Sequence, residues 1–196
     1  MERIPHWRRF ALAAWCGLVV ATPAHAQKQV EGPYREGFWI GVGLGYGGAN
    51  VSCSGCSTTR DGAPTFTLRM GGTPGPRLLV GGELNAWGRS EAGANETVGD
   101  MSAVVLWYPI RTSGLFFKGG LGVAVYSLDG SPKVESEGLG VSVGVGIDLY
   151  TGRKFSLTPF VTAMTGISGN LKVGGTDTGF AVRPNLFEVG VTATWH

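Results

Sequence analysis

Two unlike kinds of residue alternate along most of this chain, and this alternation constrains its fold more than any other feature. Between 38 and 46, large apolar side chains alternate with Trp39 and glycine, and between 139 and 149 they alternate with glycine, serine and Asp148. A period of two places successive side chains on opposite faces of a β-strand. Further segments with this pattern are 66–71, 78–85, 98–108, 117–125, 155–166 and 187–195. The chain is therefore predicted to be all-β with eight strands.

Two of these segments are irregular. Within 98–108, consecutive Val104, Val105 and Leu106 blur the alternation, and within 155–166 it is interrupted by Pro159. Proline cannot donate a hydrogen bond to a neighbouring strand, so Pro159 is expected at a bulge or near a strand end.

The predicted connections alternate in length, and this order is a second constraint. Transmembrane barrels join their strands by short periplasmic turns and longer extracellular loops. Counted from the first strand, the connections are long at 47–64, short at 74–76, long at 88–97, short at 109–114, long at 127–137, short at 151–154 and long at 167–184.

The composition decides which face of the sheet points outward. Charged residues make up 15% of the chain, whereas a soluble domain has about 25%. A glycine-rich exterior this poor in charge would be badly solvated, but small residues suit the narrow interior of an eight-stranded barrel. We therefore predict an antiparallel up-and-down transmembrane β-barrel with its large apolar side chains toward lipid.

About half of seven aromatic residues near strand ends are expected at the membrane interface. These are Phe38, Trp39, Trp107, Tyr108, Tyr150, Phe155 and Trp195.

The first 26 residues have the organisation of a secretory signal peptide. Basic Arg3, Arg8 and Arg9 precede an apolar segment at 10–20, and Ala24-His25-Ala26 resembles a cleavage site. The predicted organisation is a signal peptide at 1–26 cleaved after Ala26, a short periplasmic segment at 27–36 and a barrel domain at 37–196. Removing three Arg and one Glu from 16 basic and 14 acidic residues leaves 13 of each. A neutral mature chain gives no indication of nucleic acid binding.

The last strand carries a resemblance to a known family. Phe187, Val189, Val191, Ala193 and Trp195 alternate toward a terminal aromatic, although His196 follows it. With the signal peptide, the strand number and the order of loop lengths, the whole mature chain resembles the OmpA/OmpX-like outer-membrane β-barrel domain family. This resemblance implies location in the bacterial outer membrane, with membrane lipid and the barrel-insertion machinery as partners. Members of the family range from adhesion and serum-resistance proteins to membrane-stabilising barrels. We expect a monomer, and the sequence does not identify an extracellular ligand.

Charged residues on the small-residue phase are expected inside the barrel. They are Arg69, Glu83, Lys118, Asp148 and Glu188. Because an unpaired buried charge is costly, we interpret them as an interior charge network and predict that Arg69 pairs with Glu83. The alternative interpretation is a gated ion path.

Cys53 and Cys56 form a Cys-Ser-Gly-Cys sequence in the first predicted long loop, and Cys16 leaves with the signal peptide. A loop disulfide is the simplest interpretation, because the cell surface is oxidising. A thioredoxin-like redox role lacks its βαβ context, and a zinc site would need about two further ligands.

Catalysis is not indicated by the sequence. His6 and His25 lie in the signal peptide and His196 is the last residue, so no histidine is available as a general base inside a loop or strand. Glu135 and Glu137 are a pair of carboxylates that we interpret as a solvated loop tip. We expect neither a cofactor nor a metal site. The predicted function is structural or partner-binding, in adhesion or envelope integrity. The alternatives are a narrow channel, a lipid A-modifying enzyme or a soluble periplasmic barrel.

Overall fold

Ten antiparallel strands form the part of the chain that the computed structural model describes, which is residues 35–53, 56–57, 59–91, 93–151 and 153–196. The predicted signal peptide and most of segment 27–36 lie outside these ranges. Among the described residues, no helix is long and apolar enough to cross a membrane. The eight long strands are β1 (Gly37–Cys53), β3 (Asp61–Gly75), β4 (Leu78–Glu91), β5 (Ala94–Trp107), β6 (Leu115–Asp129), β7 (Val134–Ile147), β9 (Phe155–Val173) and β10 (Thr176–Trp195). The short strands are β2 (Cys56–Ser57) and β8 (Leu149–Tyr150).

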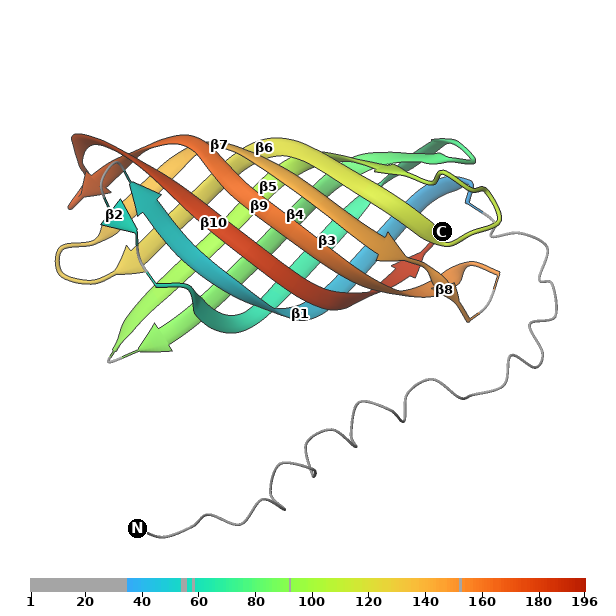
Figure 1. Cartoon of the computed structure of the whole chain (residues 1–196), viewed down its shortest axis with the longest axis horizontal. Coiled ribbons are helices and arrows are strands. Elements are labelled where there is room, and N and C mark those ends of the chain that lie inside the picture. Colours follow the sequence, from blue (N-terminus) through green and yellow to red (C-terminus); the bar gives the residue numbers. More distant parts are fainter. Residues whose placement is uncertain (1–34, 54–55, 58, 92, 152) are drawn as a thin grey trace, which may run out of the picture. The chain divides into compact units, whose positions relative to one another are not determined.

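The long strands close into one ring (Figure 1). Each strand pairs with the next long strand in the chain, and β10 pairs with both β9 and β1. The closing seam between β1 and β10 is continuous from Ile40↔Trp195 to Cys53↔Val182. Closure satisfies the backbone groups that a free sheet edge would expose. The predicted eight-stranded antiparallel barrel is confirmed.

The two faces of the sheet have the predicted orientation. Large apolar side chains point outward, and Leu44, Met101 and Val143 are each more than 60% exposed. Thr158 and Thr192 point inward and are fully buried. On β1 the outward side chains are apolar from Phe38 to Tyr46, and then change to small or polar ones. The apolar outer surface therefore forms a band of limited height, as a membrane requires.

Four of the seven candidate interface aromatics point outward, and their location at the membrane interface stays a prediction. Phe38, Trp107 and Trp195 are 63%, 50% and 49% exposed. Phe155 is only partly exposed, and its ring centroid lies 4.9 Å from that of Trp195. The other three, Trp39, Tyr108 and Tyr150, point into the barrel.

The predicted alternation of long and short loops is wrong. Most residues of the predicted long loops belong to strands, which are 14 to 20 residues long. Only residues 92–93, 130–133 and 174–175 separate the strands of three hairpins, whereas 108–114 and 148–154 connect strands at the opposite end. Outside the apolar band the outward residues become polar, so the alternation that identifies a strand is lost although backbone pairing continues.

Pro159 lies at an irregularity near the beginning of β9, as predicted. The pairing of β9 with β7 ends at Gly146↔Phe160, and its pairing with β8 begins at Leu149↔Leu157. On this side of β9, Pro159 falls between the two ladders, so its missing N–H leaves no gap in either. On the other side, Pro159 lies opposite Val191 in the ladder with β10.

Glycine is required where β3 faces β4 inside the barrel. A Cβ atom on Gly71 would lie 2.0 Å from the carbonyl oxygen of Val80, and one on Gly81 would lie 2.1 Å from that of Met70. These two glycines are partners in the ladder. Their small size lets the strands approach closely at this level of the wall.

Candidate functional site

The barrel interior is divided into layers along its axis. We call the end that carries Arg35 and His196 the terminal end, and the end where β4 meets β5, β6 meets β7 and β9 meets β10 the distal end (Figure 1). A charged layer lies between two apolar clusters, and a further polar cluster closes the terminal end.

The charged layer contains four of the five predicted interior residues. The side chains of Arg69, Glu83, Lys118 and Glu188 all have less than 7% of their surface exposed. Lys118 Nζ forms an ion pair with Glu83 Oε1. Sequence reasoning missed Asp100, which is 5% exposed and belongs to the segment whose alternation is blurred.

Asn85 joins two of the carboxylates. Its Nδ2 donates to Glu83 Oε1 at 2.8 Å and to Asp100 Oδ1 at 3.0 Å. An amide carries two N–H donors and can therefore bridge two acceptors. The bonds link Glu83, Asp100 and Lys118 into one connected group.

The predicted ion pair between Arg69 and Glu83 is wrong. The two residues are direct partners in the β3–β4 ladder, but Glu83 is bonded to Lys118 from β6. The Arg69 guanidinium instead lies near two aromatic rings, with its Cζ 5.6 Å from the centroid of Phe116 and 5.9 Å from that of Phe160. Such contacts with a ring face favour a cation within about 6 Å. The ion-pair partner of an interior charge therefore depends on which side chains extend to it across the lumen, and not on which residue lies opposite it in the ladder.

The charged layer has more acidic than basic groups. Three carboxylates, those of Glu83, Asp100 and Glu188, accompany the two cations. Neither carboxylate oxygen of Glu188 has a hydrogen-bond partner among the described residues, although its side chain is 1% exposed. Burial of this kind is strongly unfavourable for a carboxylate. The loss of either cation would therefore increase an existing imbalance.

Apolar clusters seal the charged layer on both sides. The terminal cluster consists of Trp39, Leu79, Val104, Leu106, Tyr108 and Phe116. The distal cluster consists of Ala49, Ala63, Trp87, Val98, Ala124, Met164 and Leu186. Each tryptophan is 1% exposed and donates its indole N–H to a backbone carbonyl, Trp39 to Gly72 at 3.1 Å and Trp87 to Gly47 at 3.0 Å. An eight-stranded barrel leaves little lumen, and here large side chains fill it at two levels.

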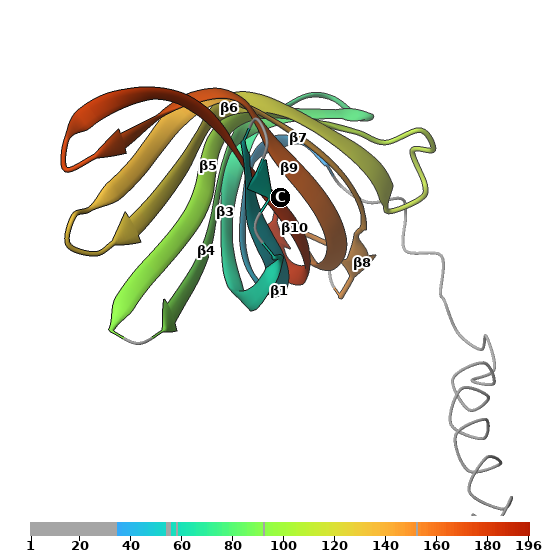
Figure 2. The same cartoon turned by 60° about the vertical axis from the view of Figure 1, so that its left-hand side comes forward.

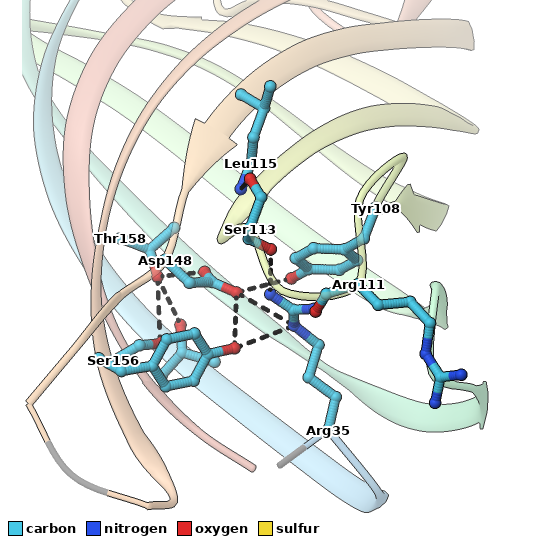
Figure 3. Close-up of polar contacts among 10 residues, drawn as sticks. Arg35, Tyr108, Arg111, Ser113, Leu115, Asp148, Ser156 and Thr158 are labelled. Carbon is cyan, nitrogen blue, oxygen red and sulfur yellow. Dashed lines mark hydrogen bonds and ion pairs between the residues drawn. The ribbon is translucent and has the colours of Figure 1, made fainter. Parts of the chain in front are cut away.

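Arg35 closes the terminal end (Figure 3). Its side chain is 3% exposed and crosses the mouth of the barrel. Nη2 donates to the carbonyl of Ser113 at 2.9 Å, and Nε donates to the Tyr150 hydroxyl at 2.9 Å. The guanidinium lies 3.6 Å from the ring centroid of Tyr108. Arg35, two residues before β1, is therefore tied to both long connections at this end.

Asp148, the fifth predicted interior charge, belongs to this terminal cluster. Its Oδ2 accepts hydrogen bonds from Tyr108 at 2.8 Å and from Tyr150 at 3.2 Å, and its Oδ1 accepts one from Thr158 at 2.8 Å. Arg35 Nε lies 3.7 Å from Oδ2. Burial, and then the charge of Asp148, raise the pKa of both tyrosines. The phenols therefore keep their protons and remain donors to the carboxylate.

Cys53 at the end of β1 is disulfide-bonded. Its ladder partner is Cys56 in β2, and the side chain of Cys56 lies outside the described ones. The pairing of these two cysteines stays a prediction. Among the described residues, no group of three or more histidine, cysteine, aspartate or glutamate side chains could hold a metal ion.

These features define the class of the protein as a transmembrane β-barrel of the outer-membrane type. No family model matches the sequence, and a search of curated proteins finds no match. Solved structures nevertheless share the fold. Neisserial surface protein A is 14% identical, with a TM-score of 0.52, over 79% of this chain and 95% of that protein. The outer membrane protein OprG from Pseudomonas aeruginosa is 15% identical, with a TM-score of 0.50, over 84% of this chain and 98% of that protein. The chain thus has the fold of the small OmpA/OmpX-like barrels.

Proposed function

We propose that this protein is a non-conducting, non-enzymatic outer-membrane barrel whose distal end binds partners outside the cell or stabilises the envelope. In this proposal the terminal end faces the periplasm, because an exported barrel with an even number of strands has both termini there. The mature chain would begin after Ala26, and the alternating residues of β10 would be read by the insertion machinery.

The observation that carries the proposal is the sealing of the lumen at two levels. A conducting barrel needs a continuous polar path. Here Trp39 and Phe116 lie in the terminal cluster and Trp87 lies in the distal one, and each is 1% exposed. Between these clusters, Glu83, Asp100 and Lys118 are linked by an ion pair and by the Asn85 amide, which favours a structural network over an ion path.

The distal strands support a role in partner binding. Beyond the apolar band, β7 exposes Glu137 and β9 exposes Lys172, and the two strands remain paired up to Val134↔Val173. Figure 2 shows the hairpins β4–β5, β6–β7 and β9–β10 projecting from this end. Paired strands hold side chains in fixed positions, so they present a defined surface with little ordering cost on binding.

A catalytic role has less support. His196 is the one histidine among the described residues, and its ring packs beside Tyr150 at the terminal end, with the centroids 5.9 Å apart. This position is at the opposite end from the projecting hairpins.

Conductance in planar lipid bilayers tests the sealed lumen. The purified mature chain, shown to be folded by a mobility shift on an unboiled gel, should give no stable current steps. A variant with Trp39→Ala and Phe116→Ala, which opens the terminal cluster, serves as the comparison. Steady conductance by the unmodified chain would contradict the proposal and favour the narrow channel.

A shortened β9–β10 hairpin tests the distal surface. Removing residues 169–182 should leave the barrel folded and inserted but reduce cell adhesion or envelope resistance to the level of a deletion strain. A lipid A mass profile that changes on deletion of the whole protein would instead favour an enzyme.

A further inference from the structure

The barrel wall is split at the distal end between β3 and β4. Pairing of these strands stops at Thr65↔Trp87, although β3 begins at Asp61 and β4 runs to Glu91. The distal part of β3 stays paired with β1, while β4 stays paired with β5 (Figure 2). Thr65 is the last residue of β3 that pairs with β4, and its neighbour on the distal side is Pro64. Proline has no N–H with which the ladder could continue.

Side chains span this split in place of backbone hydrogen bonds. Arg89 Nη1 on β4 lies 3.1 Å from Asp61 Oδ1 on β3. Arg89 Nη2 lies 3.4 Å from Glu96 Oε2 on β5. All three side chains are between 23% and 38% exposed, so the bridge is accessible from solvent.

A cavity of about 250 Å³ lies beside this bridge and is lined by Arg89, Ala94, Glu96 and Leu128. Below it lies the distal apolar cluster, in which Trp87 and Val98 are buried and against which Tyr126 packs. We call the cavity and the bridge the distal cup. Its lining residues come from β4, β5 and β6, so a ligand that enters it is held at the distal end of the barrel.

The charge of the cup favours a cation. Among the described side chains, the titratable groups of the cup are Arg89 and Glu96, which line the cavity, and Asp61 and Tyr126 beside them. The Tyr126 hydroxyl lies beside the Glu96 carboxylate. Two carboxylates face one guanidinium, and a phenol is neutral at pH 7. The excess negative charge attracts an ammonium group.

The remaining surface of the cup is apolar. Leu128 and Ala94 provide aliphatic walls beside the charged groups. A volume of this size lies just below the range of about 300 to 1,000 Å³ that is usual for ligand sites, so the ligand must be small. We propose that the distal cup binds small amphipathic cations, in which a primary ammonium group carries a short apolar or aromatic body. This inference rests on the proposed role of the distal end in partner binding and specifies the ligand class.

Nuclear magnetic resonance titration of the mature chain in detergent micelles tests the cup. The probes are phenethylammonium, phenylacetate and 2-phenylethanol, which share one apolar body and differ in charge. Phenethylammonium should shift the backbone amide signals of Ala94, Glu96 and Leu128 in a saturable manner. The anion and the alcohol should bind about tenfold more weakly or worse, because one charge-assisted contact of about 1.4 kcal/mol corresponds to a factor of ten.

Glu96→Gln removes one carboxylate from the cup without changing its shape. This variant should weaken phenethylammonium binding about tenfold, while the control Glu36→Gln, at an exposed position of the terminal end, should leave it unchanged. If Glu96→Gln does not fold, Leu128→Ala removes the apolar wall instead and should also weaken binding.

The proposal is overturned if phenylacetate binds as well as phenethylammonium, or if no saturable shift occurs at the cup. It is also overturned if the folded cup variant binds like the unmodified chain. These results are independent of the conductance measurement. A conducting barrel would contradict the sealed lumen without affecting binding at the cup, and a cup that binds no cation would leave the sealed lumen intact.

Discussion

Replacing Lys118 by methionine tests whether the charged layer holds the barrel together. The Lys118 side chain is 3% exposed and that of its partner Glu83 is fully buried. Methionine keeps most of the volume but leaves the Glu83 carboxylate without its cation. Two other carboxylates, those of Asp100 and Glu188, belong to the same layer, so the substitution changes an excess of one acid into an excess of two.

The expected loss of stability is large. Breaking a buried ion pair by removing one partner costs about 3 to 5 kcal/mol, because the other charge remains buried and uncompensated. With a urea dependence of about 2 kcal/mol per molar, a loss of about 3 kcal/mol lowers the unfolding midpoint by about 1.5 M. The double variant with Lys118→Met and Glu83→Gln removes both charges and should regain most of this loss.

Urea unfolding of the folded barrel in detergent, followed by tryptophan fluorescence and by mobility on unboiled gels, measures this effect. Lys133→Met is the matched control, because that side chain is 51% exposed and its ion pair with Glu135 faces solvent; its midpoint should not move. Arg69→Met should cost less than Lys118→Met because Arg69 has no ion pair among the described residues. A midpoint for Lys118→Met equal to that of the control would refute the reasoning, as would simple additivity in the double variant.

Two further predictions concern the barrel wall and a distal hairpin. Gly71→Ala should prevent or greatly slow assembly of the barrel, because the added Cβ would lie 2.0 Å from the carbonyl oxygen of Val80; the control Gly119→Ala meets no atom within 4 Å and should assemble normally on unboiled gels. Hydrogen bonds, first from the Gly179 amide, hold the pKa of Asp177 below its usual value of 3.8, so their stabilising effect is complete above that pH and is lost as the pH falls through the lower folded value. An amide resonance of Gly179 that titrates above pH 4 would contradict this assignment.

Alternation predicted the strands and their faces because the membrane imposes a simple rule inside the apolar band. Residues such as Leu44 and Val143 must meet lipid, and their neighbours must fit a narrow interior. Beyond the band this rule no longer applies. Glu135 and Glu137 were interpreted as a loop tip, yet both lie in β7 and remain paired with β9. Backbone pairing can continue without an apolar face, so the strands predicted from the alternation are too short at the distal end.

Burial of the interior charges could be predicted, but their partners could not. The phase of each strand indicates that Arg69, Glu83 and Lys118 point inward. Their pairing depends on how long side chains cross the lumen, and β4 and β6 are not adjacent strands. Arg35 was missed for a different reason, since it precedes β1 and belongs to no alternating segment. Asp100 was missed because its strand contains large apolar residues on both faces.

The exceptions to the alternation determine how the lumen is filled. A barrel with only small residues inside would leave room for water along its axis. Here Val104 and Leu106, which blurred the predicted strand, join Trp39 and Phe116 in the cluster that seals the terminal side. Small inward residues therefore allow a narrow barrel, and the few large inward residues fill its lumen. These side chains interrupt a polar path along the axis, and under the proposed function partners bind at the distal surface, where β3 and β4 separate and the hairpins extend.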